Sequence, residues 1–145
     1  MAHDKVLVAT DGSEPAERAV AHASELASAF GKGLTIMTVD NSIPSEALRK
    51  FAELEHATVR EVLDADCEFR LARARALTEK CCPLGVETIR EVGDPAEQIV
   101  ELAKRLQPYA LVIGRRGRGR LEGLLLGSVS QKVVSLAPCP VMVVP

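Results

Sequence analysis

Short apolar runs and amphipathic stretches alternate along the chain. Continuous apolar runs rich in β-branched residues are typical of buried strands. Such runs occupy residues 5–9 (KVLVA), 34–39 (LTIMTV), 109–114 (YALVIG) and 141–144 (VMVV), and the mixed segment 85–92 (GVETIREV) is predicted as the third of five strands. Between the first two runs, apolar residues recur at helical spacing from Ala16 to Phe30, and Gly31 and Gly33 are predicted to stop that helix. The pattern therefore predicts strands that alternate with helices.

Helix starts are predicted from cap residues. Asp11 or Ser13 can cap the first helix, because Glu14 and Pro15 follow in its first turn. Residues 93–107 begin with a turn glycine, a cap aspartate and a proline, and predict a later helix, with Asp94 as its cap. Residues 128–137 predict a last short helix before the final strand.

The segment 45–82 contains neither glycine nor proline and has helical character throughout. One straight helix of this length would span about 57 Å, which is too long for so small a domain. We therefore expect two helical pieces or a sharp bend. Residues 64–67 (DADC) are the weakest helix formers, and the change of direction is predicted there.

The alternation of strands and helices predicts one α/β domain over residues 1–145. Its expected core is a doubly wound, five-stranded parallel sheet with helices on both faces. The chain is 47% hydrophobic and only 3% aromatic, which suits an aliphatic sheet core. Few aromatics and a net charge of −2 count against nucleic-acid binding. The absence of a long apolar run predicts no membrane segment and no signal peptide, and hence a cytoplasmic protein with reduced cysteines.

Two strand exits carry polar, glycine-rich sequence. The first strand is followed by residues 10–13 (TDGS), and the fourth by residues 114–130 (GRRGRGRLEGLLLGSVS). In open α/β sheets, ligands bind at the carboxyl ends of strands, where the strand order reverses. If these strands are neighbours, their exits form one crevice.

The second loop has the composition of a phosphate cradle. Gly114, Gly117 and Gly127 allow backbone N–H groups to approach an anion, and Ser128 and Ser130 open a helix whose N-terminus favours one. No Gly-Lys-Ser/Thr sequence follows, so this is not a Walker loop. The competing interpretations are a flexible connection for the glycines, a cap for Asp11 and a solvated strip for the arginines. We expect one arginine near the phosphates and take Arg116 as the candidate.

The whole chain resembles the universal stress protein family. The resemblance rests on "VLVATDGSEPAERAVAHA", on "VGDPAEQIV", on the spaced glycines followed by Ser128, and on the closing "PCPVMVV". It implies strand order 3-2-1-4-5, and the glycine pattern resembles the ATP-binding subgroup. One departure is Arg115, where loops of the family often have a small polar residue. The nucleotide-binding candidates, implied by the resemblance and the loop, are Ala9, Thr10, Asp11, Val39, Gly114, Arg116, Gly117, Gly127, Ser128, Val129 and Ser130.

The leading hypothesis is a cytoplasmic, ATP-binding stress-response regulator, with or without Mg²⁺ on the nucleotide. Its output would be a conformation or a partner contact, since no triad or paired carboxylates can be assembled for catalysis. The alternatives are a dimeric interaction module of the same fold without nucleotide, and a nucleic-acid binder that uses the arginines. The apolar strand 141–144 predicts a homodimer, because an edge strand leaves backbone groups unpaired. The resemblance implies the same dimer.

Overall fold

The computed structural model describes residues 2–41, 46–78, 82, 84–116 and 126–145. Its centre is a five-stranded parallel sheet in the order β3-β2-β1-β4-β5. The strands are β1 (Lys5–Ala9), β2 (Gly33–Asp40), β3 (Val86–Val92), β4 (Ala110–Gly114) and β5 (Val141–Val144). The expected class, strand number and strand order are confirmed.

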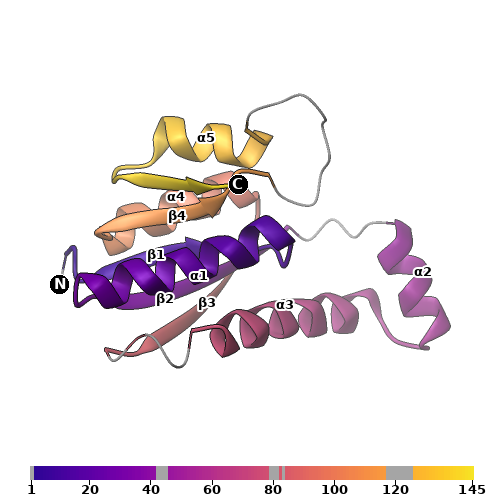
Figure 1. Cartoon of the computed structure of the whole chain (residues 1–145). Coiled ribbons are helices and arrows are strands. Elements are labelled where there is room, and N and C mark those ends of the chain that lie inside the picture. The colour runs from indigo at the N-terminus through magenta and orange to yellow at the C-terminus, as the bar shows by residue number, and fades with distance from the viewer. Residues whose placement is uncertain (1, 42–45, 79–81, 83, 117–125) are drawn as a thin grey trace.

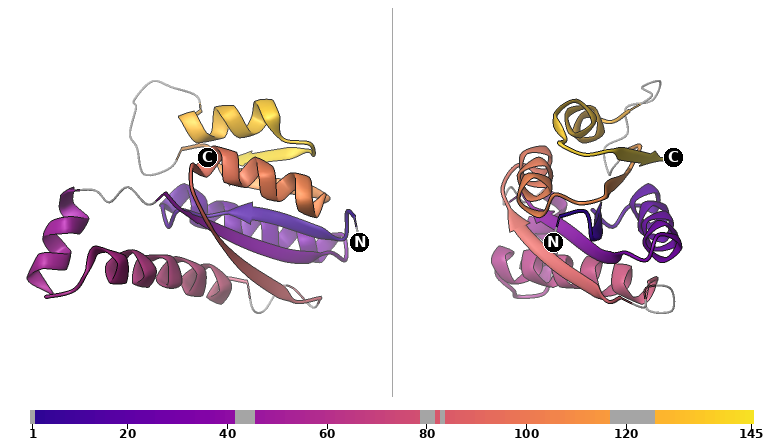
Figure 2. Two further views of the ribbon diagram at one scale, coloured as in Figure 1. Left: turned by 180° about the vertical axis from the view of Figure 1, so that it is seen from behind. Right: turned by 90° about the vertical axis from the view of Figure 1, so that its left-hand side faces the viewer.

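Helices cover both faces of the sheet (Figures 1 and 2). On one face, α1 (Glu14–Ala29) and α3 (Val59–Ala76) pack over the strands, and Val20 and Ala23 of α1 are fully buried there. On the other face, α4 (Pro95–Leu106) and α5 (Ser128–Leu136) bury Leu102 and Val133. Both cores are aliphatic, as the composition predicts. The remaining helix, α2 (Glu46–Leu54), lies beyond the carboxyl edge of the sheet, next to the start of α3 (Figure 1).

Caps explain where the helices begin. Ser13 is the N-cap of α1, and its side chain accepts a hydrogen bond from the N–H of Ala16 at 3.3 Å. Asp94 caps α4 through the N–H of Glu97 at 3.1 Å, as predicted. The first helix ends at Ala29, and Gly31 follows with a φ of +61°, a left-handed conformation that glycine adopts without strain.

The long helical segment is divided into α2 and α3, as its length requires. The predicted position of the break is wrong, because residues 64–67 lie inside α3 and the chain turns at residues 55–58 instead. Thr58 caps α3 there by accepting from the N–H of Glu61 at 3.1 Å. Asp64 and Asp66 do not break the helix, since each pairs with an arginine one turn away: Asp64 with Arg60, and Asp66 with Arg70.

Among the described residues, no helix combines the length and the apolar character that crossing a membrane requires.

Candidate functional site

The exits of β1 and β4 are neighbours at the carboxyl edge of the sheet. The two strands pair in parallel, with Val6 opposite Ala110. The first turn of α1 packs directly against the end of β4: a Cβ on Gly114 would lie 3.0 Å from the carbonyl carbon of Pro15 and 3.1 Å from the nitrogen of Ala16. Gly114 is therefore required for this close packing. The adjacency of β1 and β4, on which the predicted crevice depends, is confirmed.

The turn after β1 is built by its own polar groups. The N–H of Gly12 donates to Oγ1 of Thr10 at 3.2 Å, and the N–H of Ser13 donates to Oδ1 of Asp11 at 3.0 Å. Gly12 has a φ of +81°. Asp11 therefore shapes the turn through its carboxylate, which resolves the capping alternatives: Ser13 is the cap, and Asp11 holds the backbone that precedes it.

The end of β2 stands beside this turn. Ala9, the last residue of β1, is opposite Met37, so β2 continues through Val39 beyond the end of β1. The hydroxyl of Thr38 donates to the carbonyl oxygen of Thr10 at 2.8 Å. This bond ties the two strand ends together and places the backbone of Val39 close to the β1–α1 turn.

The first turn of α5 faces the same edge. Its N-cap is Gly127, which has a φ of −71° and provides no side-chain cap. The first N–H groups of a helix have no intrahelical partner, so this end attracts an anion. Because any residue can adopt this φ, the backbone alone does not require glycine at position 127. Glycine would be required at position 127 only if a group from outside the chain approached its backbone too closely for a side chain to fit.

Ser130 links this turn to the exit of β4. Its hydroxyl donates toward the carbonyl oxygens of Gly114 at 2.8 Å and of Arg115 at 3.0 Å, and the residue is buried. The N–H of Gly127 also donates to the carbonyl oxygen of Arg115 at 2.9 Å. The single hydroxyl proton of Ser130 is thus directed at the backbone, whereas Ser128 and Val129 are exposed at the helix end.

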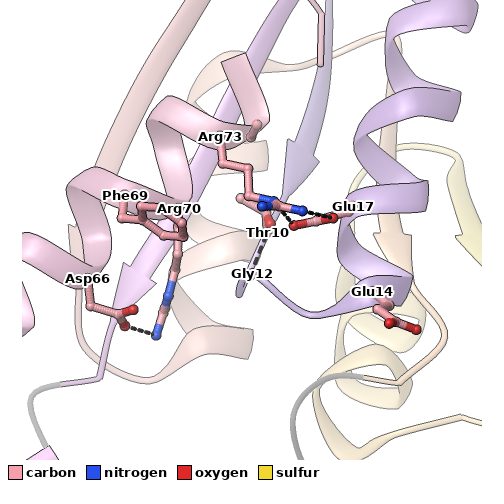
Figure 3. Close-up of a pocket in the computed structure, with 9 residues that line it drawn as sticks. Thr10, Gly12, Glu14, Glu17, Asp66, Phe69, Arg70 and Arg73 are labelled. Carbon is pink, nitrogen blue, oxygen red and sulfur yellow. Dashed lines mark hydrogen bonds and ion pairs between the residues drawn. The ribbon is translucent and has the colours of Figure 1, made fainter. Parts of the chain in front are cut away.

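A pocket of about 350 Å³ opens between α1 and α3 at this edge (Figure 3). Thr10 and Gly12 line it from the β1–α1 turn, and Glu17 lines it from α1. Phe69 and Arg70 line it from α3. The sequence motifs did not include α3, because nothing in a helix of ordinary amphipathic composition marks which of its residues face a pocket.

An ion-pair network surrounds a buried carboxylate at the end of β2. The carboxylate of Asp40 is fully buried and contacts Nη2 of Arg60 at 2.6 Å and Nη2 of Arg90 at 2.7 Å. Oδ1 of Asp64 contacts the same two atoms at 2.8 Å and 2.6 Å. Hydrogen bonds from Arg60 and Arg90 lower the pKa of Asp64, and the hydrogen bonds that Arg90 donates to Asp40 and Asp64 raise the pKa of Arg90. This network, which the sequence reading missed, fixes α3 against β2 and β3.

Cys67 and Cys139 show no sign of activation. Burial raises the pKa of the Cys67 and Cys139 thiols, which keeps both protonated at neutral pH.

The structure thus brings most of the predicted residues together at one edge. Ala9, Thr10, Asp11, Val39 and Gly114 belong to the three strand exits, and Gly127, Ser128, Val129 and Ser130 to the start of α5. Arg116 is half-buried next to the exit of β4. Gly117, Arg118 and Arg120 lie outside the described residues.

This architecture is a doubly wound α/β fold with polar residues at the exits of β1 and β2. The model of the universal stress protein family matches residues 2–145, and the chain belongs to that family. A universal stress protein of Thermus aquaticus is 36% identical, with 96% of each chain covered, and one of Methanocaldococcus jannaschii is 32% identical, with 98% of this chain and 82% of the relative covered.

Solved structures agree with this fold. The universal stress protein UspA of Lactobacillus plantarum superposes with a TM-score of 0.80 at 24% identity and covers 100% of this chain and 99% of its own. A universal stress protein solved in complex with cAMP superposes with a TM-score of 0.69 at 28% identity, covering 99% of this chain and 98% of its own.

Proposed function

We propose that this protein binds an adenine nucleotide in the crevice formed by the exits of β1, β2 and β4 and the first turn of α5. The observation that carries the proposal is the convergence of these four elements: the end of β4 packs on α1 at Gly114, and Ser130 joins α5 to that end. A similar universal stress protein has been solved with cAMP, which supports the same ligand class.

The residues present fit a phosphate at the start of α5. The N–H groups of Ser128 and Val129, which have no intrahelical partner, and the positive end of the helix dipole favour an anion, and Gly127 offers no side chain to block it. We assign Ser128, Val129 and the backbone of Ser130 to the phosphates, together with Gly117 and Arg116. Asp11 and Gly114 lie toward the ribose, and Ala9, Thr10 and Val39 toward the base. ATP is the proposed ligand, and any Mg²⁺ would be carried by its phosphates.

The proposed output is a nucleotide-dependent conformation or partner contact in a cytoplasmic stress response. A phosphate held at the exit of β4 lies next to the final strand, because the N–H of Arg115 donates to the carbonyl oxygen of Val144 at 2.6 Å. We propose no turnover of the nucleotide.

A second candidate is an interaction module that forms homodimers and holds no nucleotide. It is favoured by β5, which pairs with β4 on one side only among the described strands. The side chain of Met142 on this strand is 38% exposed. Both candidate functions include a homodimer, so a measurement of nucleotide binding is needed to distinguish them.

Equilibrium dialysis against labelled ATP tests the proposal. The first candidate predicts saturable binding with one site per chain, and competition by AMP and cAMP ranks the ligands. Mass spectrometry of nucleotide released by denaturing gently purified protein identifies the ligand that the cell supplies. Absence of saturable binding for all three nucleotides would reject the proposal in favour of the second candidate.

A further inference from the structure

The pocket between α1 and α3 adjoins the proposed nucleotide crevice and is not covered by the motifs at the strand exits. Thr10 and Gly12 line it on one side, and they belong to the same turn as Asp11. Phe69 and Arg70 face this turn from α3 (Figure 3). The turn therefore separates two spaces: the start of α5 on one side and this pocket on the other.

Arg70 is held in the pocket with hydrogen-bond donors to spare. Its Nη2 donates to Asp66 at 2.5 Å, whereas its Nη1 lies 3.5 Å from Oγ1 of Thr38, a long contact. Its Nε is buried and has no partner among the described residues. A guanidinium carries five N–H donors, and a buried donor without a partner is unfavourable. The weakly engaged Nη1, rather than the enclosed Nε, is therefore the donor of Arg70 that suits an acceptor arriving in the pocket.

The charges in the pocket select against a second phosphate. Arg70 pairs with Asp66, and Arg73 pairs with Glu17 across the gap between α3 and α1. Glu14 lines the pocket as well, so carboxylates outnumber guanidiniums there. A neutral group with hydrogen-bond acceptors fits this balance, whereas an anionic group does not.

Phe69 adds an apolar, flat surface at the same place. Its side chain is 63% exposed although it lines the pocket, and the whole chain has only three phenylalanines. Aromatic rings stack on nucleobases of any kind. A heteroaromatic ring with acceptor nitrogens would use both Phe69 and Arg70.

We propose that this pocket receives the base of the nucleotide, with Arg70 as its hydrogen-bond donor and Phe69 as its stacking surface. This inference rests on the proposed function and adds α3 to the binding site. Arg70 lies near Thr38, whose neighbour Val39 is the penultimate residue of β2, beside the β1–α1 turn. The base then lies on the α3 side of the β1–α1 turn, and the phosphates lie on the α5 side.

The test compares Arg70→Ala with Arg75→Ala, a variant that removes the same charge from an exposed position on the same helix. Calorimetry is performed with two probes, ATP and inorganic triphosphate, which lacks the base. Arg70→Ala is expected to weaken ATP binding about tenfold and to leave triphosphate binding unchanged. Arg75→Ala is expected to change neither. Phe69→Ala, at a surface position that does not threaten the fold, should also weaken ATP binding alone, with Phe51→Ala on α2 as its control.

Three results would overturn the inference. If Arg70→Ala and Phe69→Ala bind ATP as tightly as their controls, the base does not bind in this pocket. That result would leave the proposed function intact. Equal loss of ATP and triphosphate binding in Arg70→Ala, with the fold retained by circular dichroism, would make Arg70 a phosphate or structural residue. Wild-type protein that binds neither probe would reject the proposed function as well.

Discussion

The hydroxyl of Ser130 lies 2.8 Å from the carbonyl oxygen of Gly114, and this bond joins the first turn of α5 to the exit of β4. Gly114 in turn packs against the backbone of Pro15 and Ala16 at the start of α1. The anion-attracting end of α5 and the turn that contains Asp11 are thus fixed to the same strand end. The geometry of the proposed site depends on this pair of contacts.

Ser130→Ala should lower the free energy of unfolding by about 1 kcal/mol, because the buried hydroxyl of Ser130 no longer donates to the carbonyl oxygens of Gly114 and Arg115. Ser135→Ala is the matched control. Ser135 lies on the same helix, is exposed and donates to the carbonyl oxygen of Gln131 at 2.9 Å, so its removal should cost much less. Urea unfolding measures both. Equal stability of the two variants would show that the bond to Gly114 contributes nothing.

The ion-pair network predicts a specific loss of stability in acid. Arg60 and Arg90 lower the pKa of Asp64 in the folded protein below its ordinary value of 3.8. Its contribution is therefore fully present above about pH 4 and is lost as the pH falls through the lowered folded pKa. At pH 7, Asp64→Asn should be less stable than the wild type, and this difference should shrink in acid.

Urea unfolding between pH 7 and pH 3 measures that difference. Glu25→Gln serves as the control, since Glu25 is exposed on α1 and the described contacts give it no ion pair. A gap between wild type and Asp64→Asn that stays constant over the whole range would contradict the assignment to charge pairing.

The fold could be predicted from the sequence because periodicity and cap residues specify it locally. The position of the break before α3 was missed, although Thr58 and Glu61 form a Thr-x-x-Glu capping pattern that marks it. Weak helix propensity at Asp64 and Asp66 was outweighed by ion pairs to Arg60 and Arg70. The capping pattern at Thr58 therefore predicts the start of α3 better than the low helix propensity of Asp64 and Asp66 does.

The candidate site was predictable only in part. The residues at the strand exits follow from motifs contiguous in the sequence. Arg70 and Asp40 could not be found in that way, because their environments come from elements distant along the chain. The hydroxyl of Ser130 is another such case: the sequence places it at a helix start, and only the packing of α5 on β4 directs its proton toward Gly114.

The homodimer through β5 remains a prediction, and the structure changes how it is tested. Val141 and Val143 pack against the core beneath α4 and α5, so charged residues there would also disturb the fold. Met142 is more exposed, and Met142→Glu should convert a dimer to a monomer. Leu84→Glu, at an exposed position near the opposite edge, is the control. Light scattering that finds the wild type monomeric at micromolar concentration would refute the dimer.

Asp11→Asn separates the structural role of Asp11 in the β1–α1 turn from its proposed role as a ribose ligand. The amide oxygen can still accept from the N–H of Ser13, so the turn should be kept and the stability should change little. The loss of charge should weaken ATP binding by about 1 kcal/mol or somewhat more, the contribution of one ribose hydroxyl to a charged acceptor. Calorimetry measures the ATP affinity, and a thermal melt measures the stability of the variant. Unchanged affinity would leave Asp11 with a structural role alone.

Calorimetric titration of ATP into wild type and Gly127→Val tests the central claim most directly. The φ of Gly127 allows any residue, so the variant should fold normally, and its side chain would stand where we propose that a phosphate approaches the start of α5. The account predicts loss of most of the affinity, a smaller loss for Asp11→Ala and a smaller one still for Arg116→Ala. Equal ATP affinity in wild type and folded Gly127→Val would contradict it.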